Sequence, residues 1–167
     1  ILGKLFGNKY DKDVKEITPL VDKINEEFAK LNSLSNDELR AKTAEFKNQI
    51  TEFISKDKEE ITNLKEKSEL SETSSEEKEQ LYKEIDALEK TVIEKIEEIL
   101  NTILPKAFAV VKETSKRFAE NDSLEVTATK NDTEIAAVKD FASINGDKAT
   151  KSRRYHHRSR SKEQQTY

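Results

Sequence analysis

The 167-residue sequence contains no cysteine, no methionine and no tryptophan. Without cysteine the chain can form no disulfide framework, no cysteine-ligated zinc site and no thiol nucleophile. No apolar run approaches the roughly 18 residues of a membrane-spanning helix, and no secretory signal with a small-residue cleavage site is present. These absences exclude disulfide-rich, zinc-finger and membrane-spanning classes for the residues given.

Glycine occurs only three times and proline only twice. Gly3 and Gly7 lie four residues apart, whereas the phosphate-binding loop G-x-x-x-x-G-K-[ST] needs five, followed by Lys and Ser or Thr. The sequence therefore contains no Walker A loop. Because the first residue is Ile1 rather than methionine, we interpret the chain as a piece of something longer.

What the sequence has in abundance is charge, and this charge is unevenly distributed. Residues 1–150 contain 24 basic and 33 acidic residues (net −9), whereas residues 151–167 contain 6 basic and 1 acidic residue (net +5). Upstream of residue 150, Lys outnumbers Arg 22 to 2, whereas four arginines and both histidines follow it. We therefore expect a boundary near residue 150 and a disordered basic tail over 151–167, which we interpret as an out-of-frame or truncated-gene ending.

Helical periodicity dominates residues 13–121. An apolar heptad stripe runs from Val14 to Leu31, and Pro19 within it either starts a helix after Thr18 or kinks one that begins near Asp13. Ser35 and Glu38 have the spacing of a capping box, followed by apolar positions up to Leu64. A second capping box, Thr73/Glu76 or Ser74/Glu77, precedes a stripe from Leu81 to Ile103. Two such helices predict an antiparallel hairpin arm over residues 48–103, ended by Pro105, which can open a further helix.

The pattern changes after residue 121. Residues 124–129 alternate and are rich in β-formers, residues 132–140 have a short helical pattern, and residues 141–144 lead into the turn signal Asn145-Gly146. The sequence predicts the start of an incomplete mixed α/β segment over 122–150, whose strands lack partners. The fold class is thus mainly α, with N-terminal helices, a long hairpin and a small β-containing segment near 124–150.

No catalytic constellation is evident. The many carboxylates follow the solvent faces of the predicted helices, where surface pairs are the ordinary interpretation. His156 and His157 are adjacent, so their side chains point in different directions and suit a metal poorly. The Arg158-to-Ser161 tract resembles a nucleic-acid-binding arginine–serine segment, but it is a single short repeat without aromatic platforms. We therefore expect no catalytic, cofactor or metal site in this chain.

The N-terminal segment 1–12 is amphipathic. Its apolar side chains gather on one side of a helical wheel, away from Lys4 and Lys9. This pattern favours two interpretations equally, a segment that docks on the helical bundle or a helix that lies on an anionic membrane surface.

Three stretches resemble one family. They are the segments 35–47, SNDELRAKTAEFK, and 104–118, LPKAFAVVKETSKRF, together with the opening residues 2–7, LGKLFG. All three are similar in sequence, order and placement to the N-terminal region of the SecA family, the bacterial preprotein translocase ATPases. The likeness covers residues 1–149, and the 48–103 arm and the 119–149 segment resemble insertions of the Bacteroidetes branch.

The resemblance implies a cytoplasmic motor, peripheral at the cytoplasmic face of the inner membrane, that uses ATP and Mg²⁺ to export preproteins through the SecYEG channel. It further implies that the N-terminal helix binds anionic lipids and contributes to a homodimer contact. That role carries over by position to Leu2, Lys4, Leu5, Phe6 and Lys9. Without its nucleotide motifs, we do not expect the chain to hydrolyse ATP alone.

Two alternatives stay open at this point. The heptad stripes alone would suffice for a stand-alone coiled-coil interaction or scaffold protein. The basic tail would serve a nucleic-acid-binding protein, although we do not expect nucleic acid among the partners. The principal expectation is that the chain is the N-terminal portion of a preprotein translocase motor without its ATP-binding core.

Overall fold

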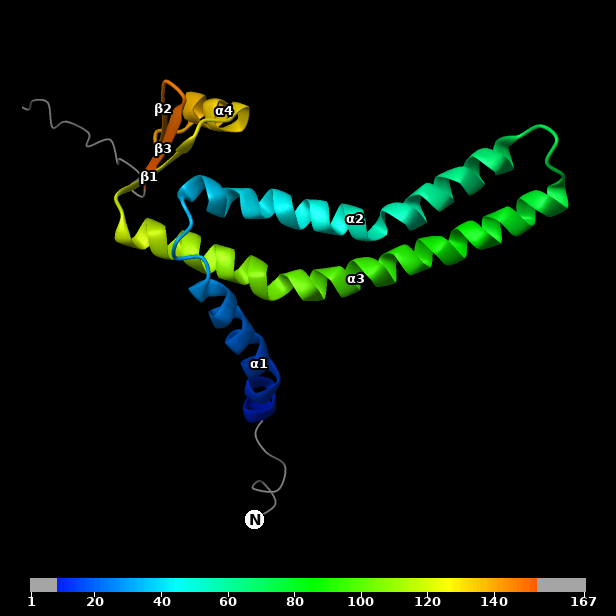
Figure 1. Cartoon of the computed structure of the whole chain (residues 1–167), viewed down its shortest axis with the longest axis horizontal. Helices are drawn as coiled ribbons and strands as arrows, with labels where there is room; N and C mark the ends of the chain where they lie inside the picture. The colour runs from blue at the N-terminus through cyan, green and yellow to red at the C-terminus, as the bar shows by residue number, and fades with distance from the viewer. Residues whose placement is uncertain (1–8, 153–167) are drawn as a thin grey trace, which may run out of the picture.

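The computed structural model describes residues 9–152, and the chain there is mainly helical with one small sheet (Figure 1). Its elements are, in chain order, α1 (Lys9–Ala29), α2 (Asn36–Glu69), α3 (Ser75–Glu120), β1 (Ser123–Thr127), α4 (Lys130–Val138), β2 (Ala142–Asn145) and β3 (Lys148–Ser152). Helices α2 and α3 lie side by side as a long antiparallel hairpin, and α1 projects from the base of that hairpin. The sheet and α4 lie at the same end. The predicted fold class is confirmed. Of the tail expected over 151–167, residues 151 and 152 belong to β3 and the rest lies outside the described residues.

Both hairpin helices begin with a capping box. The Ser35 hydroxyl accepts a hydrogen bond from the Glu38 N–H at 3.2 Å, and the Glu38 carboxylate accepts one from the Ser35 N–H at 2.7 Å. At the start of α3, Ser74 and Glu77 form the same reciprocal pair. These bonds satisfy backbone donors that lack partners in the first turn of a helix. Of the two candidate boxes before α3, the structure thus has the one at Ser74.

Two apolar clusters hold the helices together. The first lies along the hairpin, where α2 and α3 bury Ile54, Ile61, Ile85 and Val92. The second lies at the base, where Leu31, Leu39 and Ala109 are buried and join α1, α2 and α3. Each fully buried aliphatic side chain contributes about 1.5–3 kcal/mol. The hairpin is therefore stabilised by a single row of apolar contacts between two helices, which we call the seam (Ile54, Ile61, Ile85 and Val92), rather than by a thick core.

Neither proline ends a helix, which corrects the expectation for Pro105. Helix α3 runs through Pro105 to Glu120, since its packing continues on both sides, with Ile103 and Ala109 buried. Proline removes the N–H that would bond to the carbonyl of Asn101, but Asn101 is exposed, so water can satisfy that oxygen. Helix α1 likewise runs through Pro19, and the Thr18 hydroxyl donates to the Val14 carbonyl at 2.7 Å instead of capping a new helix.

The sheet has the order β1-β3-β2, with both pairs antiparallel. Ala149 of β3 is buried and is opposite Val126 on one side and Ile144 on the other. The predicted turn is confirmed, with Gly146 at φ 60° between β2 and β3. The expectation that these strands lack partners is wrong, because β3 pairs with both. Strand β3 also extends to Ser152, two residues beyond the boundary expected at 150.

Candidate functional site

The expected membrane-binding residues fall mostly outside the described part of the chain. This applies to Leu2, Lys4, Leu5 and Phe6, whereas Lys9 is exposed as the first residue of α1. The histidine pair and the arginine tract of the tail also lie outside the described residues. No helix within residues 9–152 combines the length and the apolar character needed to cross a membrane.

Helix α1 has an apolar stripe of which one half is uncovered. Ile24 and Phe28 pack against the base cluster, and the Lys112 ammonium lies 4.4 Å from the centre of the Phe28 ring. Nearer the start of the helix, Val14, Ile17 and Val21 are exposed, by 42–54%. The projecting half of α1 therefore presents an apolar stripe to solvent.

Arg117 of α3 fixes the turn between α1 and α2. Its guanidinium donates to the carbonyls of Leu31 and Leu34, at 3.2 and 2.7 Å, and to the side-chain oxygen of Asn36 at 2.8 Å. The Glu113 carboxylate, 4% exposed, accepts a further bond from Arg117 at 2.8 Å. The planar fork of arginine suits such multiple acceptors, and lysine would not replace it.

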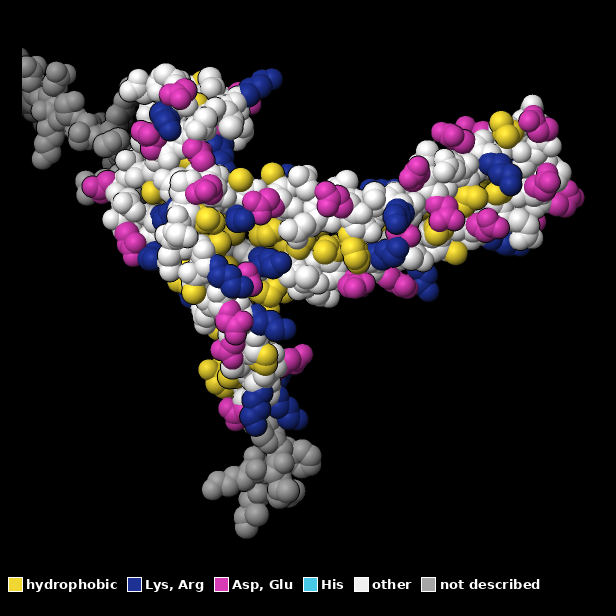
Figure 2. Space-filling view, in the orientation of Figure 1, with side chains coloured by type: hydrophobic (Ala, Val, Ile, Leu, Met, Phe, Trp, Pro, Cys, Tyr) yellow, Lys and Arg dark blue, Asp and Glu magenta, His cyan; other side chains and the backbone are white. Residues whose placement is uncertain are grey.

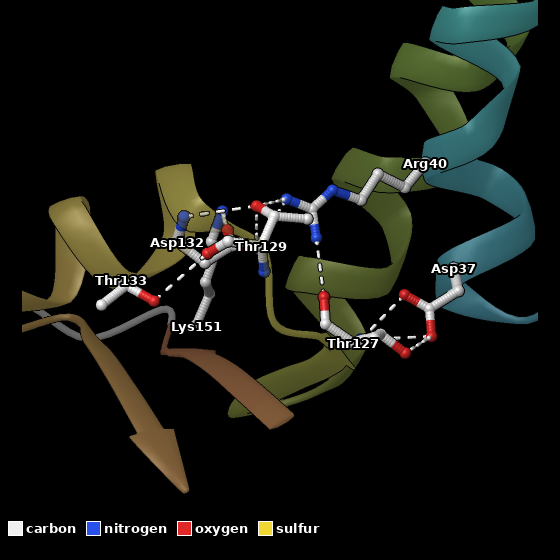
Figure 3. Close-up of polar contacts among 7 residues, drawn as sticks. All are labelled: Asp37, Arg40, Thr127, Thr129, Asp132, Thr133 and Lys151. Atoms are coloured by element: carbon white, nitrogen blue, oxygen red, sulfur yellow. Dashed lines mark hydrogen bonds and ion pairs between the residues drawn. The ribbon is translucent and has the colours of Figure 1, made fainter. Parts of the chain in front are cut away.

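A second polar cluster attaches the sheet and α4 to α2. We name it the module clamp, and its members are Asp37, Arg40, Thr127, Thr129, Asp132 and Lys151 (Figure 3). At its centre the buried carboxylate of Asp132 lies 2.6 Å from the Arg40 guanidinium and 2.8 Å from the Lys151 ammonium. Burial alone would raise the pKa of Asp132, but hydrogen bonds from Lys151, Arg40 and Thr129 outweigh it and hold the pKa far below its usual value.

The outer part of the clamp is the pair of Asp37 and Thr127. The Asp37 carboxylate accepts from the Thr127 hydroxyl at 2.8 Å and from the Thr127 N–H at 2.9 Å. These two bonds lower the pKa of Asp37. The Thr127 carbonyl in turn accepts from Arg40 at 3.2 Å. Residues about 90 positions apart in sequence are thereby joined at the end of β1.

The chemistry of the clamp is structural. A carboxylate with a strongly lowered pKa stays ionised near neutral pH and cannot serve as a general acid. The described residues contain no group of three or more His, Asp or Glu side chains placed to hold a metal ion. The clamp therefore binds two parts of the chain to each other rather than a reacting substrate.

A cavity of about 270 Å³ lies beside the clamp, between α2, α3 and β1. Its walls are largely apolar, and its charged groups are Arg40, Arg117 and Lys151. Each of these cations is already paired, with Asp132 or Glu113. The cavity thus offers no unpaired cation to a phosphate or carboxylate ligand.

The described residues contain no motif that would hold a nucleotide. A phosphate at a helix N-terminus uses several free N–H groups, and at α2, α3 and α4 one of these groups is already bonded to the cap residue Ser35, Ser74 or Thr129. The sequence contains no Walker A loop, and the cavity cations are paired. No step of ATP chemistry can be derived from these residues.

Sequence reasoning missed the clamp and the Arg117 network, yet two signals were available. Arg40 and Arg117 are the only arginines among the first 150 residues, and both hold contacts between segments distant in sequence. Thr129 and Asp132 have capping-box spacing, and the structure has that box at the start of α4. Neither signal indicates the partner across the fold.

Comparison with known proteins gives one consistent result. The family model described as the SecA DEAD-like domain matches residues 2–131. The chain is 62% identical over 148 residues to the protein translocase subunit SecA of Bacteroides thetaiotaomicron, 50% over 149 residues to that of Phocaeicola vulgatus, and 45% over 148 residues to that of Bacteroides fragilis. Each match covers 89% of this chain but only 13% of the relative. No solved structure matches the chain.

Proposed function

The chain belongs to the SecA family and is homologous to the N-terminal region of SecA, and from this premise we propose that it serves as the N-terminal portion of an ATP-driven preprotein translocase motor. The observation that carries the proposal is 62% identity to the Bacteroides thetaiotaomicron subunit over 148 residues. The matches favour neither the scaffold nor the nucleic-acid alternative. The chain spans about 13% of the length of these relatives. We therefore propose, for the whole motor of which this chain would be a part, that it uses ATP and Mg²⁺ and acts on preproteins at the SecYEG channel.

We propose that this portion holds the motor at the cytoplasmic face of the membrane. The amphipathic segment that contains Leu5 and Phe6 leads into α1, whose exposed stripe of Val14, Ile17 and Val21 continues the apolar character. Apolar insertion together with lysines near anionic headgroups supports peripheral binding without a spanning helix.

A chimera tests the translocase role. Residues 1–149 replace the corresponding region of the Bacteroides thetaiotaomicron subunit, and ATP-dependent import of a preprotein into inverted membrane vesicles is measured. We expect import at a rate within a few-fold of the parent subunit. A chimera with an unrelated helical hairpin in the same place is the negative control. A correctly folded chimera without ATP-dependent import would contradict the proposal.

Vesicle flotation tests the membrane role. The 167-residue chain is expected to float with anionic vesicles at low salt, less at high salt and little with neutral vesicles. The variant Leu5→Glu/Phe6→Glu should lose binding. A matched control, Val111→Glu/Val138→Glu, changes charge equally at two exposed apolar positions far from the N-terminus and should retain it. Equal binding by both variants would refute the N-terminal lipid site.

A further inference from the structure

The negative charge of the described chain is concentrated on the arm, residues 48–103. The arm has 16 acidic and 8 basic residues (net −8), whereas residues 9–47 and 104–152 together have 17 acidic and 16 basic residues (net −1). In Figure 2, acidic side chains are frequent on the visible face of the far end of the hairpin, with Lys side chains among them. The arm therefore attracts cationic partners and repels polyanions.

The end of the arm is also hollowed. Where α2 ends and α3 begins, a hollow of about 560 Å³ is lined by three leucines, Leu64, Leu70 and Leu81, which we call its apolar floor. Leu81 is buried, while Leu70 is 48% exposed. We name this feature the tip hollow. It offers apolar contact at a place where most of the surrounding surface is charged.

The rim of the tip hollow is acidic and largely unpaired. Glu76 and Glu84 form no ion pair with any residue in the described range, and Glu72 only accepts a bond from the Ser71 hydroxyl at 3.2 Å. Elsewhere on the arm, carboxylates meet lysines, as in Lys65–Glu89 and Lys95–Asp57.

Two other charged residues line the hollow. Glu77 is used to cap α3, and Lys67 is the single cation among the described residues that line it. The carboxylates of the rim therefore outnumber the cations that line the hollow, and the excess negative charge is not neutralised by the residues lining it.

We propose that the tip hollow docks a short basic and apolar segment of another polypeptide. One apolar side chain of the partner enters between Leu64, Leu70 and Leu81, and flanking Lys or Arg residues pair with the rim. Charge complementarity selects this occupant, since a net charge of −8 repels nucleic acid and anionic lipid. The apolar floor gives a reason for a peptide rather than a simple cation. This inference is independent of the translocase proposal and can fail without it.

The test measures binding of a fluorescently labelled peptide, acetyl-KKLLKK-amide, to the whole 167-residue chain by anisotropy. The variant Glu72→Gln/Glu76→Gln/Glu84→Gln should weaken binding about tenfold, because it removes three exposed pairs with the peptide. The matched control Glu59→Gln/Glu60→Gln/Glu94→Gln removes the same charge from exposed positions elsewhere on the arm and should weaken binding by no more than about twofold.

A second variant tests the apolar floor. Leu70→Ser alters a half-exposed side chain and should leave the helical circular dichroism unchanged. Its affinity for the peptide should be several-fold lower than that of the natural chain. A peptide with serines in place of the leucines should bind the natural chain and Leu70→Ser equally. Equal losses in the two glutamine variants, no binding of the basic apolar peptide, or equal binding of an acidic peptide would each overturn the proposal. The proposal would also be overturned if the chain bound RNA or anionic vesicles more strongly than the peptide and the rim variant abolished that binding.

Discussion

The hairpin and the sheet module are attached to the rest of the fold by different physical means. Along the hairpin, α2 and α3 bury apolar side chains at successive turns, from Ile54 and Ile61 to Ile85 and Val92. The module of β1, α4, β2 and β3 is fastened to α2 through the carboxylates of the clamp, centred on Asp132. Apolar burial is non-directional, whereas the clamp depends on the placement of each atom.

This difference predicts different failures. Loss of one seam residue weakens a hairpin whose stability is distributed over several turns. Loss of Asp132 alone leaves Arg40 and Lys151 without their shared carboxylate and should release the module as a unit. Figure 1 shows the module at the base end of the hairpin, away from its far end, so residue-by-residue measurements can distinguish the two parts.

The largest effect is expected in the seam. Ile85→Ala removes a side chain that is 4% exposed and should lower the free energy of unfolding by about 3 kcal/mol, through lost transfer energy and the cavity that remains. Urea denaturation followed at 222 nm measures it. Ile93→Ala, on the same helix but 59% exposed, should cost less than about 1 kcal/mol. Equal losses would mean that the seam is not the stabilising surface.

The clamp should give the next largest effect. Asp132→Ala leaves two cations unpaired and removes the carboxylate half of the α4 capping box, so local opening of the module should become easier by about 2 kcal/mol. Native-state hydrogen exchange should show this loss at β1 and β3 and none in the arm. Asp140→Ala removes an exposed carboxylate of the same segment and serves as the control. An equal loss of hydrogen-exchange protection in the arm and in the module would contradict the idea that the clamp holds the module alone.

Acidification should loosen the module less than the substitution does, because protonated Asp132 can still form hydrogen bonds. The folded-state pKa values of Asp37 and Asp132 lie below the ordinary 3.8, so their stabilisation is complete above that pH and declines as pH falls below it. The amide resonances of Thr127 and Thr129, which donate to these carboxylates, should stay constant from neutral pH to about 4 and move below it.

Asp132→Asn provides the control for this titration. It should abolish the acid-induced shift at Thr129 and leave the one at Thr127. A midpoint for Thr129 near pH 6 in the natural chain would contradict the paired, ionised state of Asp132.

The smallest effect is expected at the helix caps. Ser74→Ala removes the acceptor for the Glu77 N–H and should lower hairpin stability by about 1 kcal/mol. Ser75→Ala, one residue later, touches no part of the capping box and should be nearly neutral. Thermal unfolding of both variants measures the difference, and a neutral Ser74→Ala would show that the box adds nothing to the seam.

The sequence was informative where the causes are local. The capping boxes at Ser35 and Ser74 and the turn at Gly146 depend on residues within a few positions of each other, and all were predictable. Pro105 was misjudged because local chemistry argues for a break, while burial of Ile103 and Ala109 keeps the helix continuous. The clamp could not be predicted, because Asp37 and Thr127 are 90 positions apart and no local sequence pattern indicates a contact over that separation.

The length of the hairpin turns small motions into large ones. From residue 103 back to residue 75, helix α3 extends about 42 Å at 1.5 Å per residue. A tilt of about 5° at the base, where Arg117 holds the α1–α2 turn, would carry the far end through about 4 Å, by the geometry of a rod of that length. The arm is in this respect a lever, and its base is the place where a push on α1 would be converted into displacement.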